Sequence, residues 1–160
     1  MKKNILIIFL IASNVLFSQT TVTKKLGDFY KIKVYSGINV ELIKSNEHKI
    51  EVTGEKSENI KIKNSDGILK ISLKFPDLLA DGKVNVKLYY NEDIQVIDGN
   101  EGSIITGKDI NQTHIEVKAQ EGAFIDLEIK TKHLKVKSSS GGIIKLSGSS
   151  KNQEIDLDLY

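Results

Sequence analysis

Two histidines in the second half of the chain are separated by a spacing of 19. His114 and His133 each directly precede a pair of apolar residues, and Asp93 and Glu154 hold the same place in the neighbouring segments. If these segments stack in register as strands, the four side chains form one outward column with neighbours about 4.8 Å apart. Two imidazoles flanked by two carboxylates could hold a transition metal or share protons. The alternative is a solvated ladder of opposite charges, because a linear column offers no converging third ligand.

Signals of catalysis are weak. The sequence contains no Cys and none of the G-x-S-x-G, H-E-x-x-H or P-loop motifs. Asp126 and Glu128 share one face of a predicted strand, as the carboxylates of a hydrolase can, but such pairs are common on solvated strands. We therefore predict no catalytic residue, no cofactor and no enzymatic activity. A β-helix carbohydrate-active enzyme (a polysaccharide lyase or hydrolase) is the alternative.

The charged residues argue against nucleic acid as a partner. The chain has 23 Lys, no Arg and 21 acidic residues. Lys2 and Lys3 belong to an N-terminal segment for which we predict cleavage below, and without them the charge is formally neutral. Arg supplies the fork that reads phosphates and guanine edges, and it is absent. A cell-surface glycan or an envelope protein is the predicted partner. The like charges of Lys118 and Lys137 in successive repeats weakly favour an acidic glycan.

Short segments that alternate apolar and polar residues must position these side chains. This period of two with β-branched residues predicts strands that bury one face. Turn residues separate the segments, as at Gly54 and at Asp81-Gly82. The clearest segments in the first half are Ile32-Lys33-Val34, Ile38-Asn39-Val40, Ile50-Glu51-Val52, Ile60-Lys61-Ile62, 69–73 and 84–88.

The second half repeats about every 20 residues. Gly102, Gly122 and Gly141 follow one another at spacings of 20 and 19, and four apolar pairs share a template with spacings of 21, 19 and 21. Stacked repeats bury a face that one repeat alone cannot. We predict an all-β parallel β-helix (solenoid) with coils of about 20 residues; an antiparallel β-sandwich is the alternative. The pairs expected to stack inward are Ile94/Val96, Ile115/Val117, Leu134/Val136 and Ile155/Leu157.

Ser36-Gly37 interrupts a strand pattern that resumes at once with Ile38. It resembles the later pairs Glu101-Gly102, Glu121-Gly122 and Ser140-Gly141, each followed within two positions by an aliphatic residue or by Ala123. We therefore predict that it is a corner at which the chain turns into its next strand.

The stretch YSGINVELIKSNEHKIEVTGEKSENIKIKNSDGILKISLK, residues 35–74, resembles the head GIN domain family, the putative auto-transporter adhesins. Gly37-Ile38-Asn39 stands where the family has its name-giving tripeptide, and the segments IEVTGE and DGILKI are also similar. The resemblance implies a secreted or envelope-associated protein, of a kind common in Bacteroidetes, with a right-handed parallel β-helix. The family has no established activity, so no catalytic residue is carried over.

The N-terminus predicts export. Met1-Lys2-Lys3 precedes an almost wholly apolar stretch, Ile5 to Phe17, and Ser18 is a small residue at a plausible cleavage point. We predict a signal peptide at 1–18, one head GIN-like domain at 19–160, no membrane span after cleavage, and a location in the periplasm, on the outer-membrane surface or outside the cell.

The C-terminal residues read as a strand up to Tyr160. Domains of the resembled family usually continue for another coil or more. We therefore expect either that the last coil or coils are missing, or that the C-terminal coil has an open edge. Such an edge would need a cap or a partner, and it could associate with itself.

Overall fold

The computed structural model describes residues 21–74 and 83–158, so the predicted signal peptide lies outside the described residues. Within these ranges eleven strands form one sheet, and the only helix is a 3₁₀ turn, η1 (Ser57–Asn59). No helix in this part of the chain is long and apolar enough to cross a membrane. The strands are β1 (Val22–Lys25), β2 (Lys31–Val34), β3 (Asn39–Lys44), β4 (Lys49–Gly54), β5 (Ile60–Ser65), β6 (Ile68–Leu73), β7 (Val84–Tyr90), β8 (Val96–Gly99), β9 (Ile104–Ala119), β10 (Phe124–Ser138) and β11 (Ile143–Leu157).

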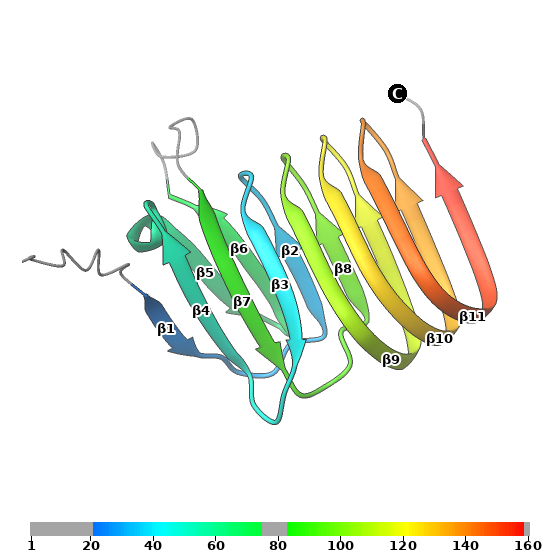
Figure 1. The fold of residues 1–160 in the computed structure, drawn as a ribbon, viewed down its shortest axis with the longest axis horizontal. Helices are drawn as coiled ribbons and strands as arrows, with labels where there is room; N and C mark the ends of the chain where they lie inside the picture. The colour runs from blue at the N-terminus through cyan, green and yellow to red at the C-terminus, as the bar shows by residue number, and fades with distance from the viewer. Residues whose placement is uncertain (1–20, 75–82, 159–160) are drawn as a thin grey trace, which may run out of the picture.

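The sheet is curled because its three long strands bend. Strands β9, β10 and β11 each run along one side of the molecule, bend, and return along the other side (Figure 1). Their first parts continue the layer of β4, β7 and β3, and their second parts continue the layer of β5, β6, β2 and β8. The two layers therefore face each other across the core.

Most strand pairs from β2 onward are parallel. Only the pairs β1–β4, β4–β7 and β5–β6 are antiparallel among the described strands. The prediction of an all-β fold is confirmed. The antiparallel arrangement expected for the alternative, a β-sandwich, occurs only in these three of the described pairs.

Alternation of apolar and polar residues builds the core. Aliphatic side chains at paired positions of successive strands point between the layers, where their branched shapes pack on the pleated surface. The buried ladder of one layer is Val86, Val40, Ile105 and Ile125. The buried ladder of the other layer is Ile32, Ile97, Val117 and Val136.

The Gly pairs form one column of corners. Ser36 and Gly37 have φ values of 62° and 64°, and both members of the later pairs are likewise in the left-handed region. Two consecutive residues of this kind make a tight turn, which Gly adopts without steric cost. The N–H of Gly37 donates to the carbonyl of Glu101 at 2.9 Å, and the N–H of Gly102 donates to that of Glu121 at 2.9 Å. The predicted corner at Ser36-Gly37 is confirmed.

The predicted inward stack is right in its middle and wrong at its C-terminal end. Ile115 pairs with Leu134 as expected. Ile155 pairs with Val136 rather than with Leu134, and its side chain is 59% exposed. The position beside Leu134 belongs to Gln153. Because Gln153 is polar, the sequence template selected Ile155, two residues later, as the partner of Leu134.

The other end of the template is also wrong. Val117 pairs with Ile97 rather than with Val96. Ile94 is buried, but it precedes β8 and lies outside the strand ladder. Ile94 is apolar because it is buried just before β8, and in the sequence this is indistinguishable from an inward position of the strand itself.

Candidate functional site

The two histidines of the predicted column lie side by side. His114 and His133 occupy paired positions of β9 and β10, and their rings stack with centroids 4.6 Å apart and an interplanar angle of 10°. The amide nitrogen of Asn152, on β11, lies 3.3 Å from Nδ1 of His133. The sequence spacing of the two histidines therefore identified this contact correctly.

The carboxylates predicted to flank the histidines do not hold the paired positions beside them. Glu154 pairs with Lys135 instead of His133, and the two side chains form an ion pair. Asp93 precedes β8, and its Oδ1 lies 4.0 Å from Nζ of Lys44. The predicted order of the column fails for the same reason as the apolar template, since paired positions of β8, β9, β10 and β11 are offset by 20 or 19 and never by 21.

The metal prediction rested on that order. The described residues contain no group of three or more His, Cys, Asp or Glu side chains that could hold a metal ion. His114 and His133 remain as two adjacent imidazoles, and zinc binding by His114, His133, Asp93 and Glu154 stays a prediction.

Ion pairs link the outward faces of β10 and β11. Lys137 lies 3.6 Å from Asp156, and Lys145 lies 3.1 Å from Asp126. The hydrogen bond and the charge of Glu154 raise the pKa of Lys135. Exposed pairs of this kind each contribute on the order of 0.2–1 kcal/mol, so their main effect is on strand register. Asp126, which shares its strand with Glu128, is thus engaged with a lysine of β11.

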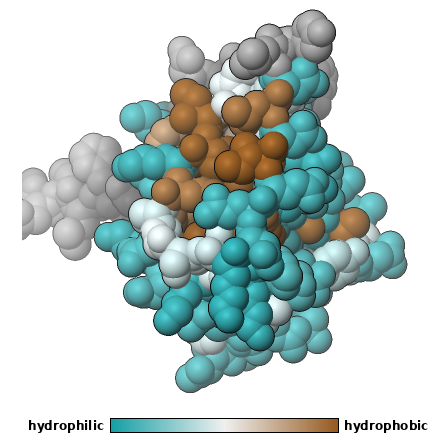
Figure 2. Space-filling model, turned by 90° about the vertical axis from the view of Figure 1, so that its right-hand side faces the viewer, coloured by the Kyte–Doolittle hydropathy of each residue, from teal (hydrophilic) through white to brown (hydrophobic). Residues whose placement is uncertain are grey.

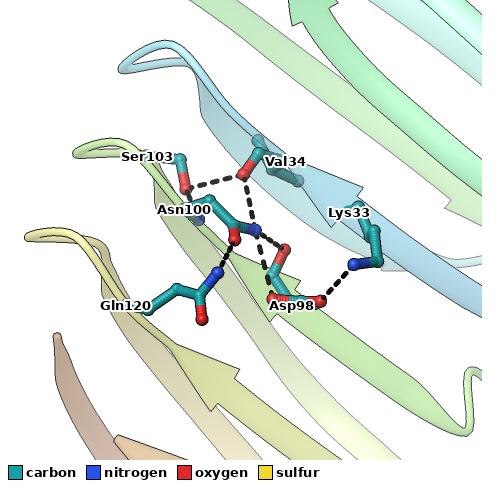
Figure 3. A network of polar contacts seen from close by, with 6 residues as sticks. All are labelled: Lys33, Val34, Asp98, Asn100, Ser103 and Gln120. Carbon is teal, nitrogen blue, oxygen red and sulfur yellow. Dashed lines mark hydrogen bonds and ion pairs between the residues drawn. The ribbon is translucent and has the colours of Figure 1, made fainter. Parts of the chain in front are cut away.

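A buried polar network lies beside the corners, and Figure 3 shows its members. Asp98 is 1% exposed, and its Oδ2 lies 3.1 Å from Nζ of Lys33. Burial acts to lower the pKa of Lys33, but the hydrogen bond with Asp98 and its charge outweigh burial and raise the pKa. Asn100 Nδ2 donates to Asp98 Oδ1 at 3.1 Å and to the carbonyl of Asp98 at 3.2 Å.

The same network joins β2, the turn after β8 and the turn after β9. Ser103 Oγ donates to the carbonyl of Val34 and accepts from the N–H of Asn100, and Gln120 donates to Asn100 Oδ1. The sequence indicated only a turn here. Because buried polar groups need partners, this network fixes the corners rather than offering a ligand site.

An apolar groove opens at the β11 end of the molecule. Its volume is about 520 Å³, and β10 and β11 line it. Ile143, Ile155 and Leu157 are 57%, 59% and 65% exposed there. Figure 2 views this end and shows hydrophobic side chains gathered in its upper part, with hydrophilic residues below. An open edge was one of two expectations from the sequence, the other being a missing last coil, and the groove was not predicted. The groove exists because the two layers stay apart at β11.

Together these features describe an all-β protein with paired surface charges and one open apolar end. A family model described as "Putative auto-transporter adhesin, head GIN domain" matches residues 28–159, and the chain belongs to this family. The resemblance seen at residues 35–74 is therefore confirmed. Among proteins of curated function, none matches the chain.

Solved structures share the fold. A putative adhesin from Bacteroides fragilis has a TM-score of 0.74 and 14% identity, over 86% of this chain and 66% of that one. A putative lipid binding protein from Parabacteroides distasonis has a TM-score of 0.55 and 14% identity, over 86% and 72%. A putative adhesin from Parabacteroides merdae has a TM-score of 0.53 and 12% identity, over 88% and 96%. At such identities the similarity shows the fold alone.

Proposed function

We propose that this chain is an exported, non-catalytic binding module of the cell envelope and that it attaches to its partner at the apolar end groove. The observation that carries the proposal is the exposure of Ile155 and Leu157 beside a strand edge that no described strand covers. Clustered apolar side chains at a surface favour contact with another molecule. A free strand edge adds backbone hydrogen bonds to such a contact.

The charged side chains support binding rather than catalysis. Glu154, Asp156 and Asp126 each form an ion pair with a lysine of the neighbouring strand. These pairs run along the outside of the stack, where each of the three carboxylates is engaged with a lysine. A glycosidase needs two carboxyl groups placed about the bond that it cleaves.

The fold proposed for strands β8 to β11 is a parallel β-helix, in which each of the long strands β9, β10 and β11 forms most of one coil. It is supported by the in-register parallel pairs of β8, β9, β10 and β11 and by the column of corners. The family description fits a protein at the cell surface or outside the cell. The proposed partner is an envelope protein or a cell-surface glycan, and nucleic acid is not proposed because Arg is absent.

The test separates binding from catalysis. The purified chain is incubated with acidic and neutral polysaccharides and with detergent-extracted envelope proteins, and retention and new reducing ends are both measured. We expect retention without products, and we expect Leu157→Lys to abolish retention because it places a charge in the groove. Lys137→Gln, which changes only the charged face, is the matched control.

Each other result has a defined meaning. New reducing ends or unsaturated sugars would replace the proposal with the carbohydrate-active enzyme. Loss of retention in Lys137→Gln, with retention intact in Leu157→Lys, would move the contact from the groove to the charged face. No retention by any probe would contradict the proposal.

A further inference from the structure

The free edge of β11 has a definite pattern of backbone groups. The N–H of Ile143 donates to Ala123 at 2.8 Å, and the N–H of Asp158 donates to Ser138 at 2.8 Å, so these residues face β10. Successive residues of a strand direct their N–H and C=O groups to opposite sides. The even-numbered residues of the first part of β11, residues 144–148, therefore face the open edge. In the second part the odd-numbered residues 153–157 face it.

The same residues carry the inward side chains. Ile144 and Leu146 pair with the buried Ile125 and Leu127 of β10. In the second part, Ile155 pairs with the buried Val136. Apolar side chains and unpaired backbone groups therefore coincide on both parts of β11. A covering strand would satisfy both needs at once.

The two parts of β11 run in opposite directions in the two layers (Figure 1). A two-fold axis between the layers, parallel to the strands, would place the first part against the second part of another copy. The two strands would meet in antiparallel orientation, and each interface would contain this contact twice.

Residues that face the open edge on one strand must lie opposite residues that face it on the other. These residues have even numbers in the first part of β11 and odd numbers in the second part, so the two numbers of each pair add to an odd total. One such register sets Ile144 opposite Leu157 of the second copy and Leu146 opposite its Ile155. The outward Lys145 then lies opposite Asp156 of the second copy. The adjacent odd-total registers set Lys145 opposite Glu154 or Asp158, so an acidic residue faces this lysine in each case.

The other two-fold arrangement is unfavourable. An axis perpendicular to the strands, running from one layer to the other, would pair each part of β11 with itself. The acidic residues Glu154 and Asp156 would then lie against the same residues of the second copy. Like charges directly opposite each other destabilise a strand pair. Charge therefore distinguishes the two arrangements.

We propose that the occupant of the end groove is a second copy of this chain, bound end to end through antiparallel pairing of the first part of β11 with the second part of the other β11. This inference rests on the proposed function, because it names the envelope protein that binds in the groove: a second copy of the chain. The paired strands would join the two cores across the interface.

Exchange of charges tests the register. The full chain, processed as the cell processes it, is studied by analytical ultracentrifugation as Lys145→Asp, as Asp156→Lys, and as a mixture of the two. Each variant alone sets like charges opposite each other twice per interface, so we expect its dimer to dissociate about tenfold more readily. In the mixture, both contacts pair opposite charges, so we expect a heterodimer close to the wild type in affinity.

Matched controls separate folding from association. Lys130→Asp makes the same charge change on an exposed residue of β10, one strand from the edge, and should leave the dimer unchanged. Ile155→Lys should give a folded monomer, since Ile155 is already 59% exposed. Ile104→Lys, on β9 and away from the edge, should stay dimeric. Circular dichroism checks that every variant is folded.

Three results would overturn the inference. One is a wild-type chain that stays monomeric at high micromolar concentration, and another is a dimer that survives Ile155→Lys. The third is a mixture no tighter than its separate components. A monomeric chain that still binds envelope protein in a Leu157-dependent way would refute self-association and leave the proposed function standing.

Discussion

Tyr90 shows how one side chain can make stability depend on pH. Its ring is 1% exposed, and its hydroxyl has no hydrogen-bond partner among the described residues. Burial, with the charge of Asp93 second, raises the pKa of Tyr90 from 10.0 to about 12. The folded protein therefore holds the neutral phenol beyond the pH at which the unfolded chain releases its proton.

The sign of the resulting pH dependence follows by linkage. A group whose pKa is raised on folding gives its full stabilisation below its unfolded pKa and loses it as pH rises towards the folded value. We predict that the free energy of unfolding falls between pH 10 and pH 12, and that it falls less in Tyr90→Phe. Denaturant titrations at several pH values measure this. Tyr30→Phe, at a residue 43% exposed, is the control and should behave as the wild type.

Strand register is the property that decides which residues matter at the scale of an element. Ile115 is 3% exposed, whereas Ile155, which has the same place in the sequence template, is 59% exposed. The difference arises because Ile115 lies between two covered strands and Ile155 lies on the last described strand.

This contrast predicts unequal effects of one substitution. Ile115→Asp should lower the free energy of unfolding by at least about 3 kcal/mol, because it removes buried aliphatic volume and buries a charge. Ile155→Asp should cost less than about 1 kcal/mol in the monomer, as surface changes usually do. Thermal and denaturant unfolding at low protein concentration measure both. His114→Asp, on the outward face, is the control, and equal losses at residues 115 and 155 would refute the register.

The pairing of β9 with β10 could be predicted from the sequence, whereas the pairing with β8 at one end and with β11 at the other could not. The pairing of His114 with His133 follows from an unbroken period between the two strands. Earlier in β9, however, Gly107 pairs with Leu127 while Ile110 pairs with Ile129, so β9 holds an extra residue at this bulge. Asp109 lies there with φ of 54°. The bulge changes the offset between β9 and β10 from 20 to 19, and it shifts the inward positions of β9 by one residue, from Ile105 and Gly107 to Ile110 and Gln112.

The candidate site was predictable only in part for a related reason. The strand pattern up to Tyr160 indicated either a missing coil or an open edge, but a groove depends on two layers that are far apart in sequence. The network of Asp98 and Asn100 was likewise not predictable, because its partners Val34, on β2, and Gln120, after β9, are distant in sequence.

The whole molecule must cross the inner membrane if its proposed role is correct. The basic Lys2-Lys3 and the apolar stretch from Ile5 to Phe17 predict cleavage near Ser18. We expect N-terminal sequencing of the envelope or secreted fraction to begin close to Gln19. A protein that begins at Met1 in that fraction would contradict the prediction. A variant with Leu10→Lys, which interrupts the apolar stretch, should remain in the cytoplasm.

Strand β10 meets β9 on one side and β11 on the other, and all its pairs with β11 keep the same offset in sequence, as Phe124 with Ile143 and Ser138 with Leu157 do. A tandem duplication of residues 124–142 would therefore insert one more repeat. The inward residues of each copy would meet identical residues on one side and those of their original neighbour, β9 or β11, on the other. Most substitutions in a globular core disturb neighbours that were fitted to the original side chain. In this architecture an unequal genetic exchange of one repeat length would extend the protein by a full layer while leaving both ends as they were, so chain length is a property that evolution can change in discrete steps.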